Sequence, residues 1–155
     1  MKSTDYVAAK AKAGDRRRSL TRRRDAHFAK ACEAVIERYR RLGREVSDRI
    51  VVEEVLRSKA PEYYISLDHC LDTIGRLLAG RRPKSPVRST LRRALWDELV
   101  ERVKTEANRR RRASLTQCVA RVLARGEASG YFISTEYALR IFHNRFKTLR
   151  VYECV

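Results

Sequence analysis

An internal repeat is the feature of this sequence that most constrains its fold. Offsets of 67 and then 68 residues place identical residues on each other: Ser47 on Ser114, Val52 on Val119, Val55 on Val122, Leu56 on Leu123, Ala60 on Ala128, Tyr63 on Tyr131, Ile65 on Ile133, Ser66 on Ser134 and Leu71 on Leu139. These identities fall at core, cap and turn positions, so the repeat preserves a supersecondary unit and not a chemical site. The chain therefore has to bury one pattern of side chains twice.

Six segments carry apolar residues at intervals of three and four, which is the periodicity of an amphipathic helix. Serines can cap these segments through their hydroxyls, and glycines can end them. The expected helices run over 26–42, from Ser47 to before Pro61, from Ser66 to Gly80, from Ser89 or Thr90 to the arginine run at 109–112, from Ser114 to Gly126, and from Ser134 to 149. The leucines expected to face the core include Leu42, Leu67, Leu78, Leu91 and Leu115.

The predicted fold class is all-α, with two pseudo-repeated three-helix units whose outline is helix-turn-helix-like. The first unit spans 26–80 and the second spans 89–150. Residues 81–88 form a basic linker with two prolines, and 151–155 form a tail. Residues 1–25 hold too few apolar side chains to bury, so we expect a disordered basic arm there.

The charge is strongly positive and unevenly distributed. The formal net charge is +17, and 28 of the 36 basic residues are Arg, whose planar group matches phosphate. Residues 26–79 are neutral overall, whereas the arm, the segment 80–96 and the region 97–155 each carry a basic excess. This pattern predicts a non-enzymatic protein that binds DNA or RNA through a one-sided surface, centred on the linker and the second unit.

Three arginine clusters and the sixth helix supply the residues expected at this surface. The residues expected to grip phosphates are Arg16, Arg17, Arg18, Arg22, Arg23, Arg24, Arg81, Arg82, Lys84, Arg88, Arg92, Arg93, Arg109, Arg110, Arg111 and Arg112. Those expected to touch phosphates or a base edge from the sixth helix are Arg140, Asn144, Arg145 and Lys147.

Two alternatives remain open. The chain could be an interaction or scaffold subunit of a larger ribonucleoprotein, phage or mobile-element assembly, with its neutral first unit packed on a protein partner or a second copy. Arginine runs in loops and tails can also be merely solvated.

The aromatic pairs Tyr63–Tyr64 and Tyr131–Phe132 could stack on unpaired bases. A repeated aromatic pair before a helix more often packs in the core, and in that case we expect Tyr64 and Phe132 to be the more exposed members.

The residue types needed for other functions do not come together in the sequence. The histidines His27, His69 and His143 lie far apart, and no catalytic constellation, metal site or cofactor motif is indicated. The four separated cysteines are expected to be reduced thiols, and three of them, Cys32, Cys70 and Cys118, stand at core-facing steps where they act as small apolar fillers. No apolar run has the length of a membrane span or a secretory leader, so we expect a cytoplasmic protein, nucleoid-associated or nuclear according to the host.

Overall fold

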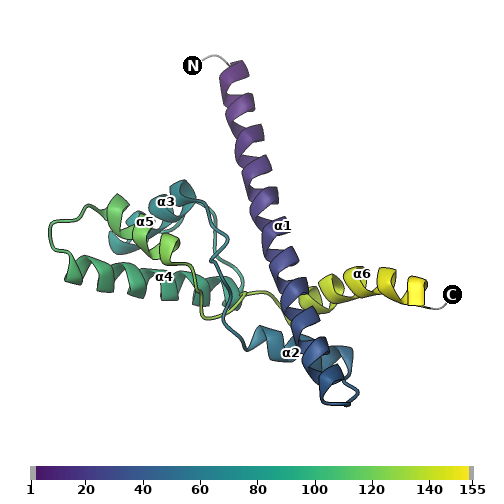
Figure 1. Cartoon of the computed structure of the whole chain (residues 1–155). Coiled ribbons are helices and arrows are strands. Elements are labelled where there is room, and N and C mark those ends of the chain that lie inside the picture. The colour runs from purple at the N-terminus through teal and green to yellow at the C-terminus, as the bar shows by residue number, and fades with distance from the viewer. Residues whose placement is uncertain (1–2, 154–155) are drawn as a thin grey trace.

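A computed structural model describes the backbone of residues 3–153 and the side chains of residues 14–146. The described backbone forms an all-helical fold, and the helices follow one another in the order that the sequence predicts (Figure 1). Their bounds are α1 (Ser3–Arg41), α2 (Asp48–Leu56), α3 (Leu67–Leu78), α4 (Thr90–Arg109), α5 (Leu115–Arg125) and α6 (Thr135–Glu153). The tail predicted at 151–155 is therefore helical as far as Glu153.

The predicted serine caps begin five of these helices. In each case the serine hydroxyl accepts a hydrogen bond from the backbone N–H three residues further on, which satisfies a donor that has no partner inside the helix. The capping residues are Ser47, Ser66, Ser89, Ser114 and Ser134. The position after α5 requires Gly126, which has a φ of +64°, and a Cβ there would lie 2.5 Å from the carbonyl oxygen of Pro61.

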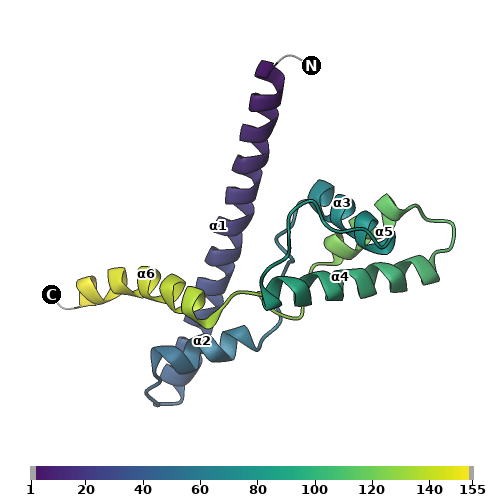
Figure 2. The same ribbon diagram turned by 180° about the vertical axis from the view of Figure 1, so that it is seen from behind.

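The third helix of each predicted unit packs against the other unit. Helix α3 packs on α4 and α5, and α6 packs on α1 and α2 (Figures 1 and 2). The molecule thus consists of two helical groups, each built from two consecutive helices and one exchanged helix. The unit boundaries 26–80 and 89–150 stay a prediction, but helix packing crosses them.

The two connections that exchange the third helices meet each other at residues that the repeat aligns. The N–H of Ala60 donates to the carbonyl of Ala128 at 3.0 Å, and the N–H of Glu127 donates to the carbonyl of Pro61 at 2.9 Å. Shortly after this contact, each connection contains a left-handed residue, at Tyr64 with φ 57° and at Phe132 with φ 54°. The two connections therefore share a backbone conformation that non-glycine residues seldom adopt.

The N-terminal segment corrects one prediction from the sequence. We expected 1–25 to be a disordered arm, whereas residues 14–25, whose side chains are described, belong to the continuous helix α1 (Figure 1). Helix propagation from an anchored segment costs far less than nucleation, and Phe28 and Cys32 anchor α1 in the core. Arginine, which supplies six of the residues 14–25, is a good helix former.

The core joins both helical groups in one apolar cluster. Its completely buried residues include Val52 and Val119, which the repeat aligns, and Ile74 and Leu99. Cys32, Cys70 and Cys118 are free and buried as expected, and Cys154 lies outside the described residues. Five leucines expected to face the core are instead exposed, because they stand at helix ends or beyond the edges of the apolar stripes: Leu42, Leu67, Leu78, Leu91 and Leu115.

Candidate nucleic-acid interface

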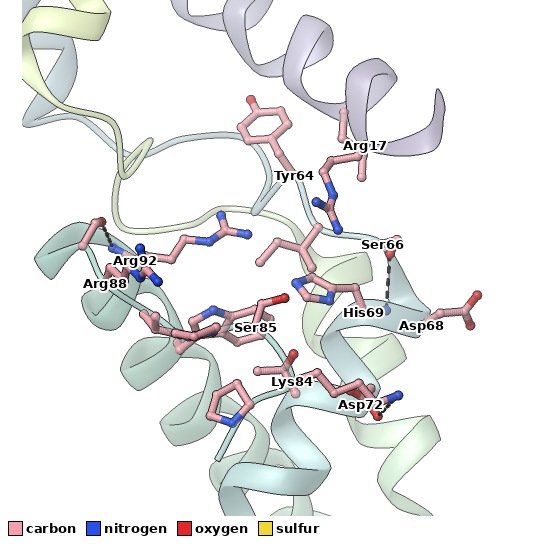
Figure 3. Close-up of a pocket in the computed structure, with 18 of the residues that line it drawn as sticks. Arg17, Tyr64, Ser66, Asp68, His69, Asp72, Lys84, Ser85, Arg88 and Arg92 are labelled. Atoms are coloured by element: carbon pink, nitrogen blue, oxygen red, sulfur yellow. Dashed lines mark hydrogen bonds and ion pairs between the residues drawn. The ribbon is translucent and has the colours of Figure 1, made fainter. Parts of the chain in front are cut away.

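A pocket with a volume of about 750 Å³ lies where α1 passes the start of α3 and the segment that leads into α4. Helix α1 contributes Arg16, Arg17 and Leu20 to its wall. The start of α3 and the residues just before it contribute the stretch 64–66 together with Asp68, His69, Asp72 and Thr73. The remaining wall comes from 83–89, Arg92 and Trp96 (Figure 3). The pocket therefore joins two arginine clusters that are far apart in the sequence.

Three arginines of this pocket have no carboxylate within ion-pair distance among the described residues: Arg17, Arg88 and Arg92. The other basic residues of the wall do have acidic neighbours. Arg16 lies 3.7 Å from an oxygen of Asp68, and Lys84 lies 3.6 Å from an oxygen of Asp72. These two pairs are exposed, so water screens them and their contribution to stability is small.

Arg92 reaches into the pocket from α4, and Arg17 enters it from α1 on the opposite side (Figure 3). Arg92 retains exposed surface, but its guanidinium lies against the Trp96 ring, 5.9 Å from the ring centroid. Burial lowers the pKa of Arg92, and the neighbouring charges of Arg24 and Arg17 lower it further. The positive charges in this region therefore repel one another, and an anion between them would relieve that repulsion.

His69 lies beside these arginines and forms an edge-to-face contact with Trp96 at a centroid distance of 5.5 Å. Burial lowers the pKa of His69, and the charges of Arg92 and Arg17 add to the decrease, while Asp72 acts in the opposite direction. The imidazole is consequently neutral at neutral pH. A neutral ring can donate or accept one hydrogen bond without adding to the positive charge of the pocket.

Two helix N-termini also border the pocket, at the caps Ser66 of α3 and Ser89 of α4. Backbone N–H groups and the positive end of the helix dipole favour anions at such positions. Tyr64 adds an aromatic side chain to the wall, with its hydroxyl 2.7 Å from the Nδ1 atom of His27. The lining thus combines uncompensated cations, helix N-termini and aromatic rings.

The arginine run at 109–112 lies far from this pocket, at the opposite end of α4 (Figure 1). Arg110 is part of a structural network, because its Nε lies 3.2 Å from the carboxylate of Glu106, which is buried. Arg125 contacts the same carboxylate at 2.9 Å from α5. Arg109, Arg111 and Arg112 are exposed and have no such acidic contact among the described residues, so they form a separate basic end.

Helix α6 packs on α1 and α2, and several of the side chains expected to touch nucleic acid from it have contacts within the protein. Arg145 pairs with Glu33 of α1 at 2.9 Å, and Arg140 lies over the Tyr137 ring. Asn144 also has interactions within the protein. The side chain of Lys147 lies outside the described residues.

The remaining predicted residues divide into paired and exposed ones. Arg23 pairs with Glu62, and Arg24 pairs with Asp25 while its guanidinium lies 5.0 Å from the Tyr137 ring centroid. Both arginines therefore have structural partners inside the protein. The predicted residues that are exposed and have no carboxylate within ion-pair distance among the described residues are Arg18, Arg22, Arg81, Arg82 and Arg93.

Sequence reasoning missed the contribution of Ser66, His69 and Trp96, which were interpreted only as a cap, an isolated histidine and a core residue. The repeat contained a signal that could have found two members of the pocket. An offset of 67 aligns Arg92 with Asp25, and an offset of 68 aligns His69 with Tyr137, so the same place in the two halves changes from acidic to basic. Such a charge change at an aligned position of a repeat points to a local function.

The described residues contain no cluster of histidine, cysteine or acidic side chains that could hold a metal ion. Among these residues, no helix has both the length and the apolar character that crossing a membrane requires. Comparisons with protein-family models, with curated proteins and with solved structures found no match. The features that bear on function are therefore the geometry of the pocket and the distribution of charge.

Proposed function

We propose that this chain is a non-enzymatic nucleic-acid-binding protein that contacts the phosphate backbone of DNA or RNA through its arginines. The observation that carries the proposal is the pocket between α1 and α4, where Arg17, Arg88 and Arg92 meet without a carboxylate partner among the described residues. Uncompensated guanidinium groups repel one another, and folding brings them together only if other interactions offset the cost. A polyanion supplies the missing negative charge.

The exposed arginines around the pocket extend this surface. Arg81 and Arg82 lie on the connection that leads into the pocket wall at 83–89, whereas Arg18 and Arg22 lie on the face of α1 opposite to the one that lines the pocket. These residues belong to the linker and the N-terminal segment in which the sequence shows its largest basic excess. The proposed surface is therefore centred on α1 and the linker, with the basic end at 109–112 as a second contact.

We also propose that the two halves of the chain derive from one repeated three-helix unit. Three pairs of features support it: the serine caps of α2 and α5, the left-handed residues Tyr64 and Phe132, and the reciprocal contact of Ala60 with Ala128. In this interpretation, two related three-helix units exchange their third helices across the central contact. The exchange couples both units into one core.

A salt titration tests the binding function. Affinities for duplex DNA, duplex RNA and single strands should be measured by fluorescence anisotropy at several salt concentrations. We expect the logarithm of the association constant to fall linearly with the logarithm of the salt concentration, because each phosphate contact releases a counterion. Binding without salt dependence, or no binding at low salt, would contradict the proposal.

The second candidate function is an interaction or scaffold subunit of a larger assembly. The observation that favours it is apolar exposure at the corner between α1 and α2, where Leu42 is 63% exposed and Ile50 is 50% exposed. A Leu42→Ser, Ile50→Ser variant should then lose association with a partner or with a second copy, measured by sedimentation. Unchanged sedimentation together with salt-dependent nucleic-acid binding would leave only the first function.

A further inference from the structure

The pocket between α1 and α4 is larger than a backbone phosphate requires. Its volume of about 750 Å³ falls in the range of pockets that enclose an organic ligand, and a phosphate group alone would leave most of it unfilled. Part of the wall is apolar or aromatic, with Leu20, Tyr64 and Trp96 among the residues that line it. The pocket is therefore suited to a group that carries both a phosphate and a ring.

The cations and the rings occupy defined places in this pocket. Arg17 and Arg92 approach from opposite sides, His69 projects from α3 beside Trp96, and Tyr64 lies beside α1 (Figure 3). A phosphate between the two guanidinium groups would also face the N-terminus of α3 at Ser66. From this position, a ring attached to the phosphate can reach the aromatic wall.

We infer that the pocket holds one unpaired nucleotide of a bound nucleic-acid strand, with its phosphate between Arg17 and Arg92 and its base against Tyr64 and His69. This inference rests on the proposed function and specifies the substrate: a strand with at least one unstacked base. Base–aromatic stacking tolerates all bases, so the pocket selects an unpaired state and not a sequence.

The surroundings of the pocket favour a strand over a phosphorylated peptide. Exposed arginines continue away from the pocket along the linker, at Arg81 and Arg82. Neighbouring nucleotides carry a phosphate at every step and can use these residues, whereas a peptide has one phosphate at the modified side chain. An unpaired nucleotide in a duplex would first have to leave its stack, so single strands should bind more tightly than blunt duplexes.

Two pairs of neighbouring arginines provide matched variants. Arg17→Gln and Arg92→Gln each remove one charge inside the pocket, whereas Arg18→Gln and Arg93→Gln each remove one charge outside it. All four variants have the same net charge. Arg17 and Arg18 are both exposed positions of α1, so this pair remains informative if Arg92→Gln perturbs α4.

The experiment measures the affinity of each variant for a short fluorescent oligothymidylate and its displacement by small competitors. We expect a loss of about tenfold or more for Arg17→Gln and Arg92→Gln, which is typical of a lost hydrogen bond to a charged group, and at most about twofold for the controls. Thymidine monophosphate should displace the strand more effectively than thymidine, inorganic phosphate or phosphotyrosine. Circular dichroism of each variant checks that the helices are retained.

The possible results separate this inference from the proposed function. If neither duplexes nor single strands bind the intact chain at low salt, the proposed function and the inference both fail, whereas binding of duplexes alone would overturn the inference only. Salt-dependent binding of the strand with equal affinities for Arg92→Gln and Arg93→Gln, and for Arg17→Gln and Arg18→Gln, would overturn the nucleotide pocket alone. Stronger displacement by phosphotyrosine would overturn it in favour of a phosphorylated peptide, and equal displacement by inorganic phosphate would show that no base is recognised.

Discussion

Two helix junctions that the repeat aligns with each other differ in charge, because Asp25 stands at one of them and Arg92 stands at the aligned position of the other. At the junction of α1 with α6, the Tyr137 hydroxyl donates to Asp25 at 2.9 Å, and Arg24 pairs with the same carboxylate at 3.0 Å. At the aligned junction of α4 with α3, Arg92 replaces the carboxylate and His69 replaces the tyrosine. The first junction is a closed structural contact, and the second opens into the pocket.

The difference shows how one helical frame can support both a structural contact and a candidate binding site. A carboxylate beside an arginine and a phenol has its charge and its hydrogen bonds satisfied within the protein. At the α3–α4 junction, Arg92 lies beside Arg17, which approaches it from α1, and beside the desolvated imidazole of His69. Neither neighbour balances the charge of Arg92 or accepts its hydrogen bonds. Under the proposed function, a few substitutions at one junction turn a contact that is satisfied within the protein into a site for an external anion.

The largest expected effect concerns another aligned pair, Glu106 of α4 and Tyr39 of α1. Glu106 is 1% exposed and lies within 4.0 Å of Arg110, Arg121 and Arg125. Glu106→Ala should lower the free energy of unfolding in urea by about 2–4 kcal/mol, because the arginines lose a shared acceptor. Tyr39→Ala, at a half-buried position, should cost less, and an equal loss in both variants would contradict the asymmetry between the halves.

The second prediction gives the α3–α4 junction the acidic residue that the aligned α1–α6 junction carries. Arg92→Asp places the carboxylate of the α1–α6 junction in the pocket, and we expect the affinity for a single strand to fall about ten- to hundredfold. The free energy of unfolding should change little, because the substitution also removes the repulsion between Arg92 and Arg17. Arg93→Asp is the control with the same charge change, and a similar loss of affinity there would show that only net charge matters.

The third prediction tests whether the α1–α6 junction is structural. Tyr137→Phe removes the hydrogen bond to Asp25 and should lower the free energy of unfolding by about 1 kcal/mol. The affinity for nucleic acid should remain unchanged, since this junction does not line the pocket. A loss of affinity without a loss of stability would assign a binding role to both junctions.

The smallest expected effect is a pH dependence that belongs to His69. Its pKa is lowered from 6.5 in the folded protein, so the unfolded chain takes up the proton at a higher pH than the folded one. The contribution of His69 to stability is therefore fully present above about pH 6.5 and decreases as the pH falls toward its folded pKa. Urea unfolding of the intact chain and of His69→Gln, compared at about pH 7 and pH 5.5, should show the larger decrease in the intact chain.

The affinity for a strand should change with pH in the direction opposite to the change in stability. A bound phosphate offsets the charges of Arg17 and Arg92, which face His69 from α1 and α4, and it acts in the same direction as Asp72 on α3. Protonated His69 adds a positive charge to the pocket, so the affinity should rise as the pH falls below about 6.5. An equal rise in His69→Gln would show that other groups are responsible.

Much of the local structure could be predicted from the sequence because it depends on neighbouring residues. A serine can cap a helix only through the N–H groups that follow it, as Ser47 and Ser114 do. Gly126 ends α5 with a positive φ as the sequence predicts, although the backbone of Pro61, distant in the sequence, also excludes a side chain there. The disorder expected at 14–25 was wrong because composition describes an isolated segment, whereas this segment extends a helix already anchored at Phe28.

The candidate site could be predicted only as a set of arginine clusters. Arg23 pairs with Glu62, and Arg145 pairs with Glu33. These two arginines are therefore not among those that have no carboxylate partner. Such pairs join residues that are distant in the sequence, so no local pattern reveals them. The gathering of Arg17 with Arg92 is equally non-local, because it depends on where α1 passes α4.

By itself, the sequence determined the helices, their caps, the apolar pattern of the repeat and the excess of arginine, since each depends on residue type and local spacing. Only the tertiary structure decided which helices pack together. Both halves present nearly the same apolar pattern, so α3 and α6 have equivalent faces available in either half, and periodicity cannot choose between them. The exchange of these helices and the course of α1 then decided which charges are neutralised and which arginines surround an open pocket.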